Sequence, residues 1–125
     1  MTLEVRVPQL VPPSPNVPIF HWGQRAARVK KTRAAVALVL SQHEPPPLPL
    51  VVTLIRESSG TLDGHDNLMM SMKAVVDQVA IWIGLPTNKR GHANDADTRV
   101  TWKYEQNRVP RKRAGTLIRF ERRED

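Results

Sequence analysis

The chain contains no cysteine and no long apolar run, and both absences narrow its class. Without cysteine among its 125 residues it can form no disulfide, no thiolate nucleophile and no cysteine-based zinc site. No apolar run approaches the roughly 20 residues that a membrane-spanning helix needs. Charged and proline residues interrupt the N-terminal region early, so no secretory signal is recognisable there. We therefore expect a cytoplasmic protein without a membrane partner.

Several catalytic motifs are also missing. The sequence has no glycine-rich phosphate loop and no Gly-x-Ser-x-Gly element. Its four histidines have no recognisable metal-binding spacing; they are His21, His43, His65 and His92. None of these motifs can therefore be used to assign a function.

Charge is the most informative feature of the composition. Lys and Arg number 19 and Asp and Glu number 12, which gives a net charge of +7. Such a bias favours a polyanionic partner, most simply nucleic acid. Charge alone does not separate DNA from RNA or from a membrane surface, and it also fits a basic protein with no special partner.

The length suits a single domain, residues 1–125, with one modest core. Strands are predicted at 2–7, at 48–55, at about 100–105 and at 114–121. The run 48–55 is almost entirely apolar, which is typical of a central strand buried on both faces. The last two strands are expected to pair as a hairpin around the basic turn 107–113.

Two helices are predicted, at about 23–43 and 66–83, from apolar residues at helical spacing. Prolines follow each of these segments within a few residues and end the helix. The order is therefore strand, helix, strand, helix, strand, strand. It indicates an α+β (α/β) domain with a mixed four-stranded sheet and both helices packed on it.

Two groups of acidic residues are the best candidates for chemistry. Asp63, His65 and Asp66 precede the second helix, and Asp95 and Asp97 precede the third strand. If that strand start lies beside the helix start, the carboxylates can converge, and such oxygen-rich sites suit Mg²⁺ or Mn²⁺.

Structural roles for the same residues remain open. Asp66 is a good helix N-cap and Asp63 a good turn residue, while Asp95 and Asp97 suit a loop and a strand edge. His65 can be a ligand, a general base or a bystander.

A polar stripe is predicted on the second helix. At 100° per residue, Lys73 and Asp77 each fall within about 20° of Asp66, opposite a broad apolar face. Asp77 is placed to hold Lys73 as an i,i+4 ion-pair partner.

The order of these residues resembles a known family. Leu62-Asp63-Gly64-His65-Asp66-Asn67-Leu68, then Lys73 and Asp77, then Asp95-Ala96-Asp97 before the strand Val100–Gln106 is similar to the phage branch of the RusA-type Holliday-junction resolvases. Pro12-Pro13-Ser14-Pro15-Asn16 resembles that family's proline-serine-asparagine segment. The resemblance extends over nearly the whole chain.

The resemblance implies a homodimer in phage-infected or bacterial cytoplasm that binds four-way DNA junctions and cuts symmetrically related strands with Mg²⁺ or Mn²⁺. By this resemblance, Asp66 matches the acidic residue before Asn-Leu, and Asp95 matches the essential acid of the later pair. Lys73 matches a helix lysine that contacts the scissile phosphate or its metal-bound water. We expect Asp63, Asp66 and Asp95 to hold the metal, with His65, Asp77 and Asp97 as candidate helpers.

The chain departs from the family at three places. Many members carry an acid two residues before Asp66, where this chain has Gly64. Asn94 stands where a second acid often lies. The segment 85–93 is longer than usual, which either displaces Asp95 or supplies a DNA-contacting loop.

We expect the basic residues to contact phosphates: Arg25, Arg28, Lys30, Lys31, Lys89, Arg90, Arg108, Arg111, Lys112 and Arg113. Two alternatives to a resolvase remain. One is a non-catalytic DNA-binding protein, or a degenerate homologue. The other is a metal-dependent nuclease that acts on other branched DNA.

Overall fold

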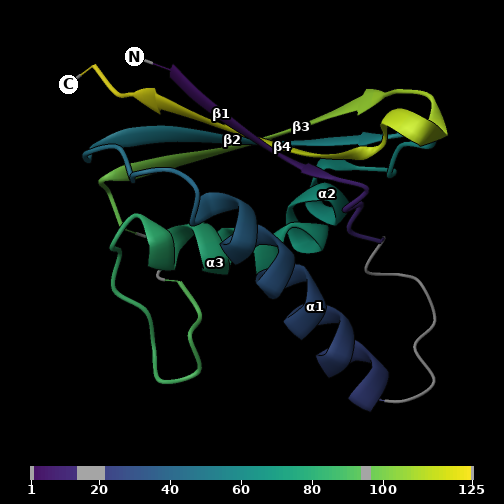
Figure 1. Cartoon of the computed structure of the whole chain (residues 1–125), viewed down its shortest axis with the longest axis horizontal. Coiled ribbons are helices and arrows are strands. Elements are labelled where there is room, and N and C mark those ends of the chain that lie inside the picture. Colours follow the sequence, from purple (N-terminus) through teal and green to yellow (C-terminus); the bar gives the residue numbers. More distant parts are fainter. Residues whose placement is uncertain (1, 14–21, 94–96, 125) are drawn as a thin grey trace.

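The computed structural model describes residues 2–13, 22–93 and 97–124, with nothing described of the Trp22 side chain. The elements are β1 (Thr2–Pro8), α1 (Trp22–Leu40), β2 (Leu50–Ser58), α2 (His65–Ser71), α3 (Lys73–Trp82), β3 (Val100–Arg108), the 3₁₀ turn η1 (Arg111–Arg113) and β4 (Gly115–Arg122). The predicted mixed four-stranded sheet is confirmed, and the helices lie together on one of its faces (Figure 1). Within the described residues, no helix is long and apolar enough to cross a membrane.

The strand order is β1-β4-β2-β3, with β2 parallel to β3 and antiparallel to β4. The predicted central position of β2 is therefore correct, but the predicted hairpin between the last two strands is wrong. β4 instead lies between β1 and β2, because its apolar side chains Ile118 and Phe120 are fully buried there. The half-exposed strand β3 takes the edge and reaches it through the crossover formed by α2 and α3.

The predicted helix 66–83 is interrupted at Met72, which separates α2 from α3. The Ser71 hydroxyl donates to the Leu68 carbonyl over 2.7 Å, and Met72 N bonds the Met69 carbonyl, three residues back, over 3.2 Å. A serine that bonds back to its own helix in this way bends it. Asp66 and Lys73 consequently belong to two different helices.

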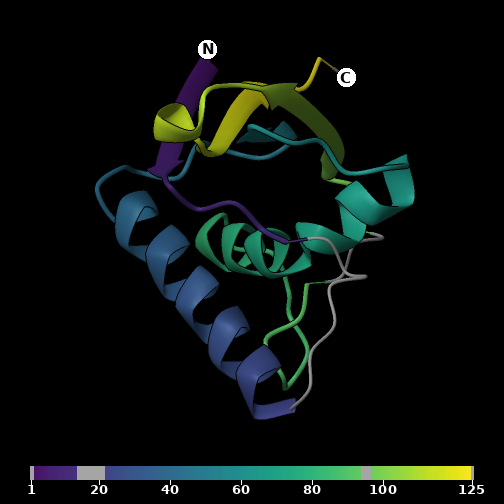
Figure 2. The same cartoon turned by 90° about the vertical axis from the view of Figure 1, so that its right-hand side faces the viewer.

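The core lies between the sheet and the helices, which cover the sheet from below in both views (Figure 2). Strand register places Val5, Ile118 and Leu54 in one row facing the helices. These side chains pack with buried residues of α1 and α3, among them Val36, Leu40, Val75, Val76 and Val79. Burial of this apolar face explains why the helices stay on one side.

The opposite face of the sheet is bare of helices and carries charged side chains. Seven of them lie on it by register: Glu4, Glu57, Glu105 and Glu121 with Arg6, Lys103 and Arg119. Arg119 donates to Glu4 over 2.9 Å, and Arg6 donates to Glu57 over 3.2 Å. The charges on this face nearly cancel, so the excess positive charge of the chain lies elsewhere.

Candidate functional site

A cleft of about 390 Å³ separates α1 from the α2–α3 pair. Its lining combines apolar and charged side chains: Pro12, Pro13, Arg25, Arg28, Val29, Thr32, Met70, Ser71, Lys73, Ala74, Asp77 and His92. Two residues of the predicted polar stripe, Lys73 and Asp77, thus face predicted phosphate contacts, Arg25 and Arg28. The cleft thus brings together the predicted residues Lys73 and Asp77 with Arg25 and Arg28, whereas the predicted acids Asp63 and Asp66 do not line it.

Asp77 is the buried acid of this cleft, only 3% exposed. Its Oδ1 lies 3.3 Å from Lys73 Nζ and also accepts a hydrogen bond of 2.8 Å from the backbone N–H of Ala93. The predicted i,i+4 ion pair is therefore confirmed. Asp77 additionally fixes the end of the loop that follows α3, a role that spacing on the helix did not indicate.

Asp63, His65 and Asp66 lie at the start of α2, and all three are exposed. Gly64, with φ of 80°, occupies the N-cap position, and no side chain caps the helix. The proposal that Asp66 is the N-cap is therefore wrong. Asp66 lies instead in the first turn, where the helix dipole favours a carboxylate. It precedes Met70, a residue of the cleft wall, by one turn on the same helix face.

The turn before α2 is fixed against β3. Gln106 accepts from Leu62 N over 2.8 Å and donates to the Leu62 carbonyl over 2.9 Å. The rings of His65 and Tyr104 meet edge to face, with centroids 6.1 Å apart. The acidic turn is thereby held beside the second half of the edge strand.

This placement bears on Asp97, the acid before β3 that the structure describes. The start of α2 contacts Tyr104, which lies roughly 13 Å along the strand from Val100, its first residue. The strand start thus lies away from the helix start, contrary to the arrangement that would bring Asp97 to Asp66. Asp97 instead pairs with Arg99 over 2.9 Å. Hydrogen bonds from Arg99 lower the pKa of Asp97 to about 2.

Asp95 and Asn94 fall outside the described residues. In the part of the chain that is described, no three Asp, Glu or His side chains lie close enough together to hold a metal ion. Asp63 and Asp66 supply carboxylate oxygens, the donor type that Mg²⁺ prefers. Within the described ranges these two carboxylates do not make up a complete ligand set.

The first helix carries a dense positive charge, with five Lys or Arg residues and no acid in its sequence. Arg25, Arg28, Lys30 and Lys31, which the sequence predicts as phosphate contacts, are exposed. Arg33 is different, because its Nε donates to Gln78 Oε1 over 3.2 Å and its Nη2 to the Gly91 carbonyl over 3.4 Å. Arg33 therefore joins α1 to α3 and to the loop beyond it.

That loop is an ordered hairpin. Oδ1 of Asn88 accepts from the backbone N–H groups of Arg90 and His92 at 2.8 and 3.0 Å. Gly91 has φ of 77°, a value that favours glycine. The predicted DNA-contacting residues Lys89 and Arg90 are thus exposed on a closed turn, while His92 lines the cleft.

The remaining predicted phosphate contacts, Arg108 and Arg111 to Arg113, are exposed at the β3–β4 connection. The backbone of this turn is tied to the start of the chain. Gln9 Nε2 donates to the Lys112 carbonyl over 3.1 Å, and Arg6 Nη2 donates to the Arg113 carbonyl. The backbone of the basic turn Arg111–Arg113 is therefore held in place by the start of the chain.

Arg56 is a buried structural residue beside the cleft that sequence reasoning missed. It is 7% exposed, and it donates to the Pro12 carbonyl over 3.0 Å and to the Gly60 carbonyl over 2.8 Å. Burial lowers its pKa. It links the wall of the cleft to the turn that leads to Asp63. The signal in the sequence was a charged residue continuing the apolar strand run 50–55.

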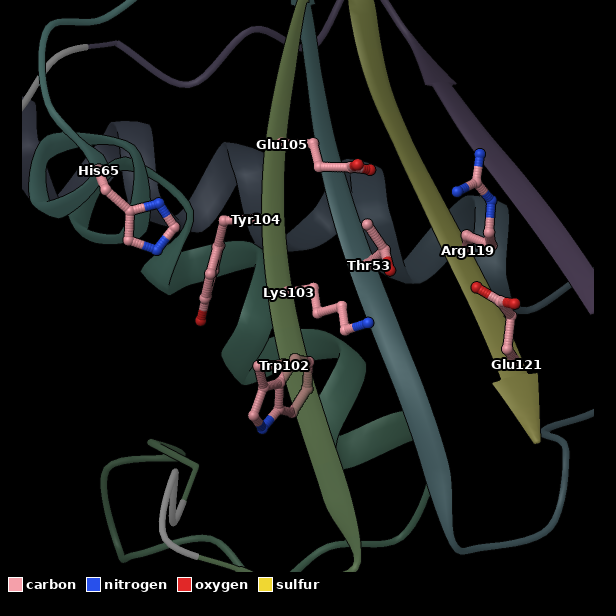
Figure 3. Close-up of a pocket in the computed structure, with 8 residues that line it drawn as sticks. All are labelled: Thr53, His65, Trp102, Lys103, Tyr104, Glu105, Arg119 and Glu121. Carbon is pink, nitrogen blue, oxygen red and sulfur yellow. The ribbon is translucent and has the colours of Figure 1, made fainter. Parts of the chain in front are cut away.

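A hollow of about 410 Å³ spans the β3 edge and the bare face of the sheet. In Figure 3, Lys103 and Glu105 lie over the bare face near Thr53, while Trp102, Tyr104 and His65 lie on the other side of β3. Lys103 and Arg119 balance Glu105 and Glu121 around it. The hollow therefore has no excess positive charge, whereas the cleft is lined by Arg25, Arg28 and Lys73 with Asp77 as its one acid among the described residues.

No model of a known protein family matches the chain. A search of curated proteins finds no significant relative either. Functional assignment therefore rests on the residues and on the geometry described above.

Proposed function

We propose that this chain is a metal-dependent, structure-specific DNA endonuclease that acts as a homodimer on four-way junctions. The observation that supports it best is the cleft in which the Lys73–Asp77 ion pair faces Arg25 and Arg28. Two coordinated cuts on a symmetric substrate require two related active sites, which is the reason for proposing a dimer.

The helix side of the molecule is the proposed DNA face. Charges nearly cancel on the bare face of the sheet, whereas α1 is positively charged without an acid of its own. Phosphate contacts from Arg25 and Arg28 would position the duplex without reading its sequence. Lys89 and Arg90 on the ordered hairpin extend this surface.

In the proposed reaction, Asp63 and Asp66 would hold the metal ion, and the family resemblance assigns the third ligand to Asp95. A bound Mg²⁺ would supply an activated water and would offset charge on the phosphodiester. Lys73 stabilises negative charge that develops on the phosphate in the cleft. Asp77 acts as a positioning residue, because it orients Lys73 and is itself buried.

The test is cleavage of a synthetic four-way junction, with flap, fork and linear duplex DNA beside it, in Mg²⁺, Mn²⁺ or EDTA. We expect paired, metal-dependent nicks at the junction. Asp66→Asn should abolish cutting and keep junction binding. Glu44→Gln, the same chemical change at an exposed acid between α1 and β2, is the control. Full activity of Asp66→Asn would remove Asp66 from the site, and preferred cutting of flaps or forks would reassign the substrate.

A second candidate function is a non-catalytic protein that binds branched DNA. The observation favouring it is the lack of a three-ligand metal site among the described residues, together with Gly64 in place of an acid. Junction binding that is unchanged by metal and never followed by cutting would establish this alternative.

A further inference from the structure

A second groove, of about 550 Å³, adjoins the cleft, and the Pro12–Pro13 segment lines both. It lies between α1 and the chain that leaves β1, and its lining includes Leu10, Val11, Arg28, Lys31 and Ala35. No acidic side chain belongs to the described residues that line it. The groove therefore has an apolar floor and a positively charged wall on α1.

The segment between the groove and the cleft is a fixed ridge. Gln9 N donates to the Ala114 carbonyl over 2.9 Å, and the Thr116 hydroxyl donates to the Leu10 carbonyl over 2.7 Å. Arg56 Nε donates to the Pro12 carbonyl over 3.0 Å. Gln9 has φ of 62°, an uncommon conformation for a residue other than glycine, and such positions cluster at functional sites. Figure 2 shows this segment crossing the molecule from the end of β1 toward α2.

Both depressions share one cation. Arg28, Thr32 and the two prolines line the cleft as well as the groove, so Arg28 lies at the ridge between them. Lys31 lines only the groove. At the far end, the bond from Gln9 to the Lys112 carbonyl brings the basic turn Arg111–Arg113 next to the groove. Positive residues thus continue from the cleft, past the ridge, to the tip of the sheet.

We propose that this groove binds the phosphate backbone of a second DNA arm while the cleft holds the strand to be cut. The inference rests on the proposed function, because it assumes that DNA occupies the cleft. Two arms that diverge at a branch point can lie on the two sides of the Pro12–Pro13 ridge, whereas one straight duplex fills one side. The ridge and groove therefore supply preference for branched over linear DNA.

The test compares Lys31→Ala with Lys30→Ala. Both lysines are exposed neighbours on α1 and lose the same charge, but Lys30 lines neither the cleft nor the groove. Binding to a four-way junction and to a linear duplex of equal length is measured in EDTA over a range of salt. The melting curve of each variant checks that it is folded.

Lys31→Ala should weaken junction binding several-fold and duplex binding little, and lower the junction salt slope by about one. Lys30→Ala should weaken both DNA forms equally. Equal effects of the two variants, or no junction preference in the parent protein, would overturn the proposal that the groove binds a second DNA arm. The outcome is separable from catalysis. If the protein cuts junctions but Lys31→Ala has no selective effect on junction binding, the proposed nuclease function stands and the proposed role of the groove fails. If Lys31→Ala weakens junction binding selectively but the protein shows no metal-dependent cutting, the role of the groove stands and the nuclease function fails.

Discussion

Asp77 and Ala93 are joined by a hydrogen bond of 2.8 Å from the Ala93 N–H to the Asp77 carboxylate. The same carboxylate oxygen lies 3.3 Å from Lys73 Nζ. One buried side chain thus holds both the cationic residue of the cleft and the end of the hairpin beside it. Changes at Asp77 should therefore affect stability and DNA cleavage by separable routes.

Asp77→Asn should keep the hydrogen bond to Ala93, because the carboxamide oxygen can still accept it, and should lose the attraction to Lys73. Asp77→Ala removes both and should cost about 1–3 kcal/mol more, the usual penalty of an unsatisfied buried group. Urea unfolding of both variants measures the difference. Equal stability of the two would show that the Ala93 hydrogen bond contributes nothing. The proposed role of Asp77 predicts slower junction cutting by Asp77→Asn despite near-normal folding.

Arg56→Met should destabilise the protein by roughly 2–4 kcal/mol, because two carbonyls lose a charged donor in a buried place. Arg56→Lys should recover only part of this, since an ammonium cannot reproduce the geometry of the guanidinium fork. Denaturant unfolding gives both values. If the denaturant midpoint of Arg56→Met equals that of the parent protein, Arg56 does not stabilise the Pro12–Pro13 segment.

Gly91→Ala should cost about 1–2 kcal/mol, because its φ of 77° is unfavourable for a residue with a Cβ. The added Cβ would also lie 3.0 Å from Nη2 of Arg33, which anchors the hairpin. Gly60→Ala is the matched control, since no atom lies within 4 Å of its added Cβ. Thermal unfolding compares the two variants, and equal melting temperatures would contradict a strained hairpin at Gly91.

The pair Asp97–Arg99 predicts a pH dependence of stability. The pKa of Asp97 is lowered to about 2 by Arg99, whereas an unfolded aspartate titrates near about 3.9. A lowered folded-state pKa stabilises the protein above the unfolded value, and this contribution is lost as the pH falls from about 4 through about 2. The stability difference between the parent protein and the Asp97→Asn variant should therefore shrink as the pH falls over that range.

Thermal melts at several pH values between about 2 and 6 would measure this effect. Arg99→Gln supplies the control, because it removes the side-chain hydrogen bond, which is the largest cause of the shift, and the charge, while the backbone N–H at position 99 still donates. In an Arg99→Gln background, Asp97→Asn should change the pH dependence less than in the parent protein. A stability difference between the parent protein and the Asp97→Asn variant that stays constant over the whole range would refute the assignment.

Much of the architecture was predictable from local patterns. Alternation at 2–7 and the apolar run from 48 gave β1 and β2, and helical spacing gave α1 and the region of α2 and α3. The break at Met72 was missed, because the bond from the Ser71 hydroxyl to the Leu68 carbonyl competes with a pattern that still fits one helix. The position of β4 was missed as well, since two neighbouring strands in sequence need not be neighbours in a sheet.

The candidate site was predictable in part. The i,i+4 spacing of Lys73 and Asp77 is a local relation, and the ion pair is present. Their position opposite Arg25 and Arg28 depends on how α1 packs against α3, which no spacing within one helix reveals. The separation of Asp97 from the start of α2 depends likewise on the register of β3 beside β2.

By itself, the sequence determined the fold class, the positive charge and the lack of thiol chemistry, because periodicity, net charge and composition are properties of the chain alone. The tertiary structure decided which residues share a cleft, that Asp77 is buried, and that a fixed ridge divides two basic depressions. These depend on contacts between residues far apart in sequence, such as Arg56 with Pro12 and Gln9 with Lys112. Packing of the apolar face selects those contacts, and no local pattern specifies them.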